Sequence, residues 1–115
     1  MKQNVKIFPS VMAQNQQELN ALFKRLRGVS QTLHLDIADG KFVPNTSLWF
    51  PFRLSSRFAY NAHLMINDPV RWIEKHGQKV GVCIASFEAV KDVSKFIDFL
   101  KQKKKRVGNS FLFLF

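Results

Sequence analysis

Three side chains that could bind a metal and transfer a proton lie in two short apolar segments. His34 and Asp36 are two residues apart in the first segment, and His63 lies in the second. In a β-strand, residues i and i+2 point to the same face, so an imidazole and a carboxylate would stand together. Neutral imidazole and carboxylate suit zinc, iron or manganese. The pattern therefore predicts a divalent-metal site formed by His34, Asp36 and His63.

Each of these residues also has an interpretation without a metal. Asp36 or Asp39 could serve only to form a turn, since Asp39-Gly40 is a common turn pair. His34 could be a buried, hydrogen-bonded histidine. Three such groups in one layer of adjacent strands favour the metal site, because burying each without a partner costs about 1–3 kcal/mol. Glu88, which follows a later strand, could also face the site.

The elements that would position these residues alternate between short strands and amphipathic helices. Gly28 is placed to end the first helix, while Asp68 and Pro69 suit the N-cap and N1 positions of another. The expected strands span residues 5–8, 32–37, 60–66 and 79–85, and a fifth begins near 107. The expected helices span residues 19–26, a short stretch within 48–57, 69–77 and 90–100. This alternation indicates βαβ units and a parallel sheet.

The strands recur at intervals of roughly 25–30 residues, which is typical of a TIM (β/α)₈ barrel of ~250 residues. The 115 residues supply about four βα units and the start of strand five. We therefore expect an α/β fold in which residues 1–115 form a single domain, roughly the first half of such a barrel. Active sites of these barrels lie at the C-terminal ends of the strands.

The charge is strongly basic, with 18 Lys and Arg against 8 Asp and Glu, a net charge of +10. Half of this excess lies in residues 91–106. Such a run could bind nucleic acid through its phosphates, or could be the solvated C-terminal end of a helix. We favour the helix, because no stacking aromatic residues are interleaved with the basic ones, and we expect no nucleic-acid partner.

Cysteine content and hydropathy exclude several other classes of protein. Cys83 is the single cysteine, which excludes an internal disulfide framework and a multi-cysteine metal site. In an apolar strand it is expected to be an inert core thiol. No uncharged apolar run approaches the ~18–20 residues of a membrane-spanning helix, and no secretory signal is recognisable. We expect a cytoplasmic protein without a membrane partner.

Residues 34–45, HLDIADGKFVPN, resemble the signature of the ribulose-phosphate 3-epimerases. Pro9-Ser10, His63-Leu64-Met65 and Asn67-Asp68-Pro69 fit the same pattern in order and spacing. The resemblance runs from about residue 6 to residue 108. It implies a metal-dependent isomerase of the TIM-barrel type that converts D-ribulose 5-phosphate to D-xylulose 5-phosphate, by epimerisation at C3, in the pentose phosphate pathway.

Site roles follow from the resemblance by position. It implies that Asp36 is both a metal ligand and the acid/base that removes the C3 proton, leaving an enediolate that the metal stabilises. His34 and His63 would be metal ligands, with His63 also near the substrate, and Ser10 would hydrogen-bond the phosphosugar. The implied cofactor is a divalent cation, either zinc, iron or manganese. A second aspartate, on the opposite face of C3, would return a proton.

The sequence departs from the family pattern in several places. Ala38 stands where the family has methionine, and Ser86 where it usually has histidine. The second aspartate, the fourth metal ligand and the phosphate-binding loops would belong to a C-terminal half beyond residue 115. We therefore expect little epimerase activity from this chain alone. The alternative is a non-catalytic half-barrel that binds a metal or phosphosugar and forms a homo-oligomer through its sheet edges and its apolar end, residues 111–115.

Overall fold

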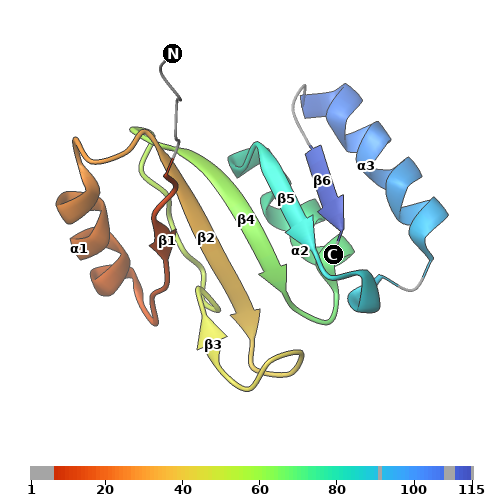
Figure 1. Cartoon of the computed structure of the whole chain (residues 1–115), viewed down its shortest axis with the longest axis horizontal. Coiled ribbons are helices and arrows are strands. Elements are labelled where there is room, and N and C mark those ends of the chain that lie inside the picture. Colours follow the sequence, from red (N-terminus) through yellow and green to blue (C-terminus); the bar gives the residue numbers. More distant parts are fainter. Residues whose placement is uncertain (1–6, 91, 108–110, 115) are drawn as a thin grey trace, which may run out of the picture.

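A single sheet carries the candidate site. The computed structural model describes residues 7–90, 92–107 and 111–114. The strands run in the order β1-β2-β4-β5-β6, every pair on this path is parallel, and β3 pairs antiparallel with β2 (Figure 1). Their bounds are β1 Ser10–Val11, β2 Thr32–Asp39, β3 Thr46–Ser47, β4 Ala59–Met65, β5 Val82–Ala85 and β6 Phe111–Leu114. This topology confirms the predicted parallel α/β fold, consistent with the N-terminal half of a TIM barrel.

Helices form the second layer, and their ends follow the predicted capping signals. The bounds are α1 Gln16–Leu26, α2 Pro69–His76 and α3 Val93–Val107, with short 3₁₀ turns η1 Gly77–Lys79 and η2 Phe87–Ala89. Asp68 caps α2 by accepting a hydrogen bond from the backbone N–H of Arg71 at 3.1 Å, with Pro69 at the first helical position. Beyond α1, Gly28 has a φ of 80°, which glycine adopts without strain.

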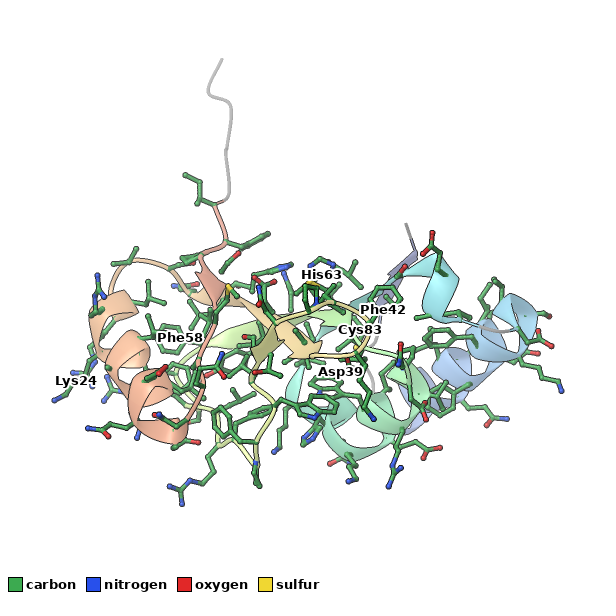
Figure 2. All side chains as sticks on the ribbon, turned by 90° about the horizontal axis from the view of Figure 1, so that it is seen from below. Lys24, Asp39, Phe42, Phe58, His63 and Cys83 are labelled. Atoms are coloured by element: carbon green, nitrogen blue, oxygen red, sulfur yellow. The ribbon has the colours of Figure 1, made fainter. Side chains whose placement is uncertain are left out.

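The two faces of the sheet differ in burial. Residues of β2, β4 and β5 alternate, one side chain packing into the core and the next remaining partly exposed. The covered face, which packs against the helices, comprises Leu33, Leu35, Ile37, Ala62, Leu64, Cys83 and Ala85, each at most 2% exposed. The open face includes His34, Asp36, Asn61, His63, Val82 and Ile84, all partly buried. Figure 2 shows His63 on the side of the sheet away from α2.

The helix predicted within 48–57 is wrong. The chain there follows β3 as an irregular loop, so the crossover from β2 to β4 has no helix. Leu48 has a φ of 52°, in the left-handed region, and Pro51 lacks an N–H and disfavours helical backbone at the preceding residue. Gln16 holds the loop instead, donating to the Arg53 carbonyl at 3.0 Å and accepting from its N–H at 2.8 Å.

The first strand lies later than predicted. β1 is Ser10–Val11 rather than residues 5–8; Ile7 and Phe8 are 77% and 44% exposed, and residues 5 and 6 lie outside the described ranges. Pairing with β2 decides this position, because the N–H of His34 donates to the Pro9 carbonyl at 2.9 Å and Ser10 lies opposite His34. Apolar character alone did not reveal which residues would find a partner strand.

The C-terminal part of the chain follows the predicted order with shifted bounds. β5 begins at Val82 rather than at residue 79, because η1 occupies the preceding residues. α3 runs to Val107, so β6 begins at Phe111. Most of the basic run at 91–106 is therefore helical, with residue 91 and the side chains from 103 onward outside the description. Among the helices that the structure describes, none has the length and hydropathy to cross a membrane.

Candidate metal centre

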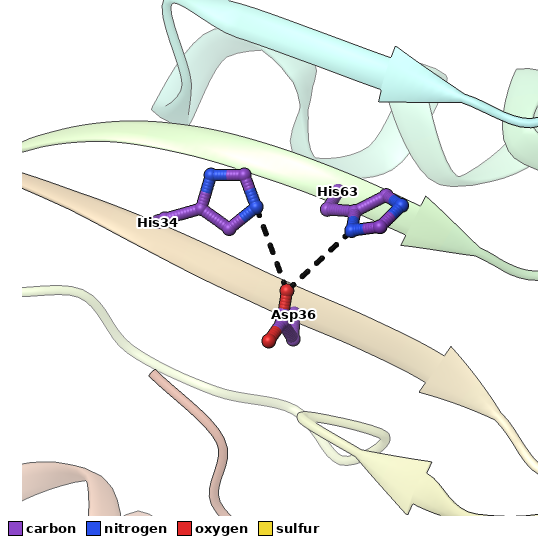
Figure 3. A network of polar contacts seen from close by, with 3 residues as sticks. All are labelled: His34, Asp36 and His63. Carbon is purple, nitrogen blue, oxygen red and sulfur yellow. Dashed lines mark ion pairs between the residues drawn. The ribbon is translucent and has the colours of Figure 1, made fainter. Parts of the chain in front are cut away.

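Strand register brings the predicted ligands together. In the parallel pair β2–β4, Asp36 lies directly opposite His63, and His34 lies opposite Asn61. Residues opposite one another in a parallel pair share a face, as do residues two apart on one strand. His34, Asp36 and His63 therefore converge on the open face, where the side chains of both histidines are directed toward the carboxylate (Figure 3).

The distances in this cluster match those around one ion. The Oδ1 of Asp36 is 3.5 Å from the Nε2 of His34 and 3.6 Å from the Nδ1 of His63. A charge-assisted hydrogen bond would be shorter, about 2.7–2.9 Å. Ligand atoms bound tetrahedrally at about 2.0–2.1 Å lie about 3.4 Å apart. The three side chains can present ligand atoms all within 4.8 Å of one another, so the donor set fits a single transition-metal ion.

The surroundings of the cluster favour the metal-binding form of His63. The side chains of His34, Asp36 and His63 are 20%, 16% and 26% exposed, so they are sheltered but reachable. Burial lowers the pKa of His63, and the nearby His34 lowers it further, while Asp36 raises it; the net direction is down. The imidazole is then neutral near pH 7, the form that binds a metal.

The other residues singled out from the sequence lie outside this cluster. Ser10 is opposite His34 on β1, so it shares the open face and is exposed at its edge. Glu88 is exposed in η2 and is absent from the ligand cluster found among the described residues. Cys83 belongs to the covered face, and burial raises the pKa of its thiol to about 12, as expected of an inert core thiol.

Asp39 has the turn role that the sequence left open. Its Oδ1 accepts hydrogen bonds from the N–H groups of Lys41 and Phe42 at 2.8 and 2.9 Å, and its Oδ2 accepts one from Asn67 at 2.9 Å. Partial burial raises the pKa of Asp39, but these hydrogen bonds together outweigh it and hold the pKa below its usual value. Asp39 thus fastens the loop after β2 to the end of β4.

Two grooves elsewhere on the described surface do not include the cluster. One of about 580 Å³ lies between α2 and α3, and one of about 560 Å³ lies between the loop at Trp49 and α2. Both are on the helical side of the sheet. The side chains of His34, Asp36 and His63 instead stand on the open face, at the strand positions that would line a barrel.

Two residues of the open face were missed in the sequence. Asn61 lies opposite His34. Met65 lies opposite Ala38, which is two residues beyond Asp36 on β2. The signal was available, since Asn61 and Met65 flank His63 at a spacing of two residues. Only the i+2 rule already used for His34 and Asp36 was needed to place them.

Comparison with known proteins assigns the chain to a family. Residues 6–114 match the model of the Ribulose-phosphate 3 epimerase family. Relatives named ribulose-phosphate 3-epimerase include those of Chlamydia pneumoniae, 28% identical over 96% of this chain and 51% of the relative, and Bacillus subtilis, 28% identical over 90% and 51%. That of Candida glabrata is 27% identical over 84% and 48%.

The match covers most of this chain but only about half of each relative. It covers nearly all of this sequence, including His34, Asp36 and His63. The chain spans about half the length of the curated relatives it matches. On the strength of the family match and the parallel sheet, the chain belongs to the ribulose-phosphate 3-epimerase family.

Proposed function

We propose that this chain contributes the metal-binding half of a ribulose-phosphate 3-epimerase site. The reaction is epimerisation at C3 of a ketopentose phosphate, D-ribulose 5-phosphate to D-xylulose 5-phosphate, in the pentose phosphate pathway of the cytoplasm. The observation that carries the proposal is the placement of one carboxylate oxygen of Asp36 3.5 and 3.6 Å from two imidazole nitrogens. Family membership supplies the reaction class.

The residues of the open face would have separate roles in metal binding, proton transfer and substrate binding. His34 and His63 would hold the metal as neutral ligands, and zinc, iron and manganese all suit this donor set. Asp36 would bind through one oxygen and use its carboxylate to accept the C3 proton from one face of the substrate. Ser10, at the edge of the face, would hydrogen-bond the phosphosugar, with His63 also beside it. A bound divalent cation would stabilise the negative charge that develops on the substrate oxygens.

Proton balance defines what this half-site lacks. A proton that Asp36 removes from C3 and returns from the same side restores the original configuration. Inversion needs a second proton donor on the opposite face of C3, and the cluster found among the described residues contains one carboxylate. We infer that the second donor and the phosphate-binding groups come from residues outside 1–115, in a C-terminal half or another chain.

Metal binding and proton exchange test this proposal separately from full turnover. The chain of residues 1–115 is titrated with Zn²⁺ or Mn²⁺ by calorimetry and then incubated with ribulose 5-phosphate in D₂O. We expect one metal per chain and slow deuterium uptake at C3, detected by NMR, with little xylulose 5-phosphate. Asp36→Asn should lose both metal binding and deuterium uptake, whereas Asp98→Asn, at an exposed position on α3, should keep both. Absence of metal binding by the unmodified chain would overturn the proposal.

A second candidate function is a non-catalytic metal or phosphosugar binder that self-associates. Apolar side chains on or beside the open face favour it: Val82 and Ile84 are only partly buried, and Met12 is 55% exposed. β1 also lies at one end of the described strand order, and such an edge could pair with another chain. Light scattering separates the two cases, because a monodisperse monomer that binds metal and exchanges the C3 proton contradicts the self-associating binder.

A further inference from the structure

We propose that Asn61 is a positioning residue for His34, accepting a hydrogen bond from the ring N–H that faces away from the metal. This inference rests on the proposed metal site and deepens it. Asn61 lies directly opposite His34 in the β2–β4 register and is partly buried on the open face. Within the described ranges, neither the Nδ1 of His34 nor the amide of Asn61 has a hydrogen-bond partner.

The chemistry of a metal-bound histidine calls for such a partner. His34 directs its Nε2 toward Asp36, so Nδ1 carries the proton when Nε2 binds a metal. Histidine ligands almost always donate this second N–H to an acceptor, which fixes the tautomer and the ring orientation. The amide oxygen of Asn61 is an acceptor of the required kind. The next residue in the same row, Val82, cannot compete for either group.

The position of Asn61 along its strand argues for support of a ligand rather than contact with substrate. Asn61 precedes His63 by two residues, so its row lies farther from the C-terminal strand ends than the row of Asp36 and His63. Substrates of parallel barrels approach from those C-terminal ends. Asn61 therefore lies level with His34 and one row below Asp36 and His63, where it can fix His34 but is shielded from a sugar above them.

Two near-isosteric substitutions separate an acceptor role from mere packing. Asn61→Leu removes the acceptor at similar volume, and Asn61→Asp keeps it. The matched control is Thr32→Val, one row further down the same face and partly buried. Zn²⁺ affinity is measured by calorimetry on each chain, with circular dichroism to check folding. We expect Asn61→Leu to weaken binding about 10–100-fold, with Asn61→Asp and Thr32→Val binding at least as tightly as the unmodified chain.

A spectroscopic measurement reads the hydrogen bond itself. In Zn²⁺-loaded chain labelled with ¹⁵N-histidine, the Nδ1–H signal of His34 should persist in the unmodified and Asn61→Asp chains and be lost through exchange in Asn61→Leu. Equal affinities and signals for Asn61→Leu and the unmodified chain would overturn the inference, as would equal weakening by Asn61→Asp. If the unmodified chain binds no Zn²⁺, the metal site fails first, and that result is distinct from normal Zn²⁺ binding by Asn61→Leu.

Discussion

The covered and open faces of the sheet are built from alternate residues of the same strands, yet they differ in burial and in polarity. Leu33, Leu35 and Ile37 are fully buried against the helical layer, while His34 and Asp36 between them remain partly exposed. Parallel strands buried on both sides usually read as continuous apolar runs. The interruption of such a run by polar residues at a spacing of two therefore marks the face that carries the candidate site.

The largest expected effect tests whether stability resides in the covered face. Leu35→Ala should reduce the free energy of unfolding by about 2–5 kcal/mol, because the side chain is fully buried and leaves a cavity. Val82→Ala on the open face should cost under about 1 kcal/mol, since this valine is only partly buried. Urea unfolding followed by circular dichroism measures both. Equal losses would show that the two faces contribute alike.

Metal addition should stabilise the chain through the open face alone. Zn²⁺ at 100 times its dissociation constant should raise the free energy of unfolding by about 2.7 kcal/mol, because the ion binds the folded chain preferentially. The increase, read as a rise in thermal midpoint, should vanish on adding a chelator. Asp36→Asn should also abolish it, whereas a rise that persists in Asp36→Asn would place the bound ion elsewhere.

A substitution at Asp39 tests how much its hydrogen bonds at the C-terminal end of β2 contribute to stability. Asp39→Ala should cost about 1.5 kcal/mol at pH 7, because three backbone N–H groups lose a charged acceptor. The folded-state pKa of Asp39 lies below its usual 3.8, so its contribution is complete above that value and is lost as pH falls through the folded pKa. Urea midpoints of the two chains should converge in acid. Asp98→Ala, at an exposed position, should change little at either pH.

The smallest expected effect concerns α2, the helix that follows β4. Asp68→Ala should cost about 1 kcal/mol, because the N–H of Arg71 loses its cap, while Asp68→Ser should retain most of the stability. Thermal unfolding of the two variants provides the comparison. Zn²⁺ affinity should be unchanged in both, and a parallel loss of affinity would mean that α2 and the open face are more tightly coupled than their separation suggests.

Local patterns predicted most of this architecture and the convergence of His34, Asp36 and His63. The shared face of His34 and Asp36 follows from the two-residue period of a strand, and the start of α2 follows from Asp68 and Pro69. The predictions that were wrong concerned segments whose structure depends on contacts with residues distant in the sequence. The position of β1 depends on its register with β2, and the apolar residues at 48–57 gave no sign that Gln16 would hold them as a loop.

The crossover without a helix also bears on how the protein can be altered. Gln16 anchors the loop at Arg53, and the hydroxyl of Tyr60 donates to the Ser55 carbonyl, so both ends of the short bend at residues 56–57 are fixed. The bend itself is exposed and precedes the N-terminal end of β4, whereas Asp36 and His63 lie nearer the C-terminal ends of their strands. A reporter peptide or a whole guest domain could be spliced in at this bend, away from the cluster of His34, Asp36 and His63.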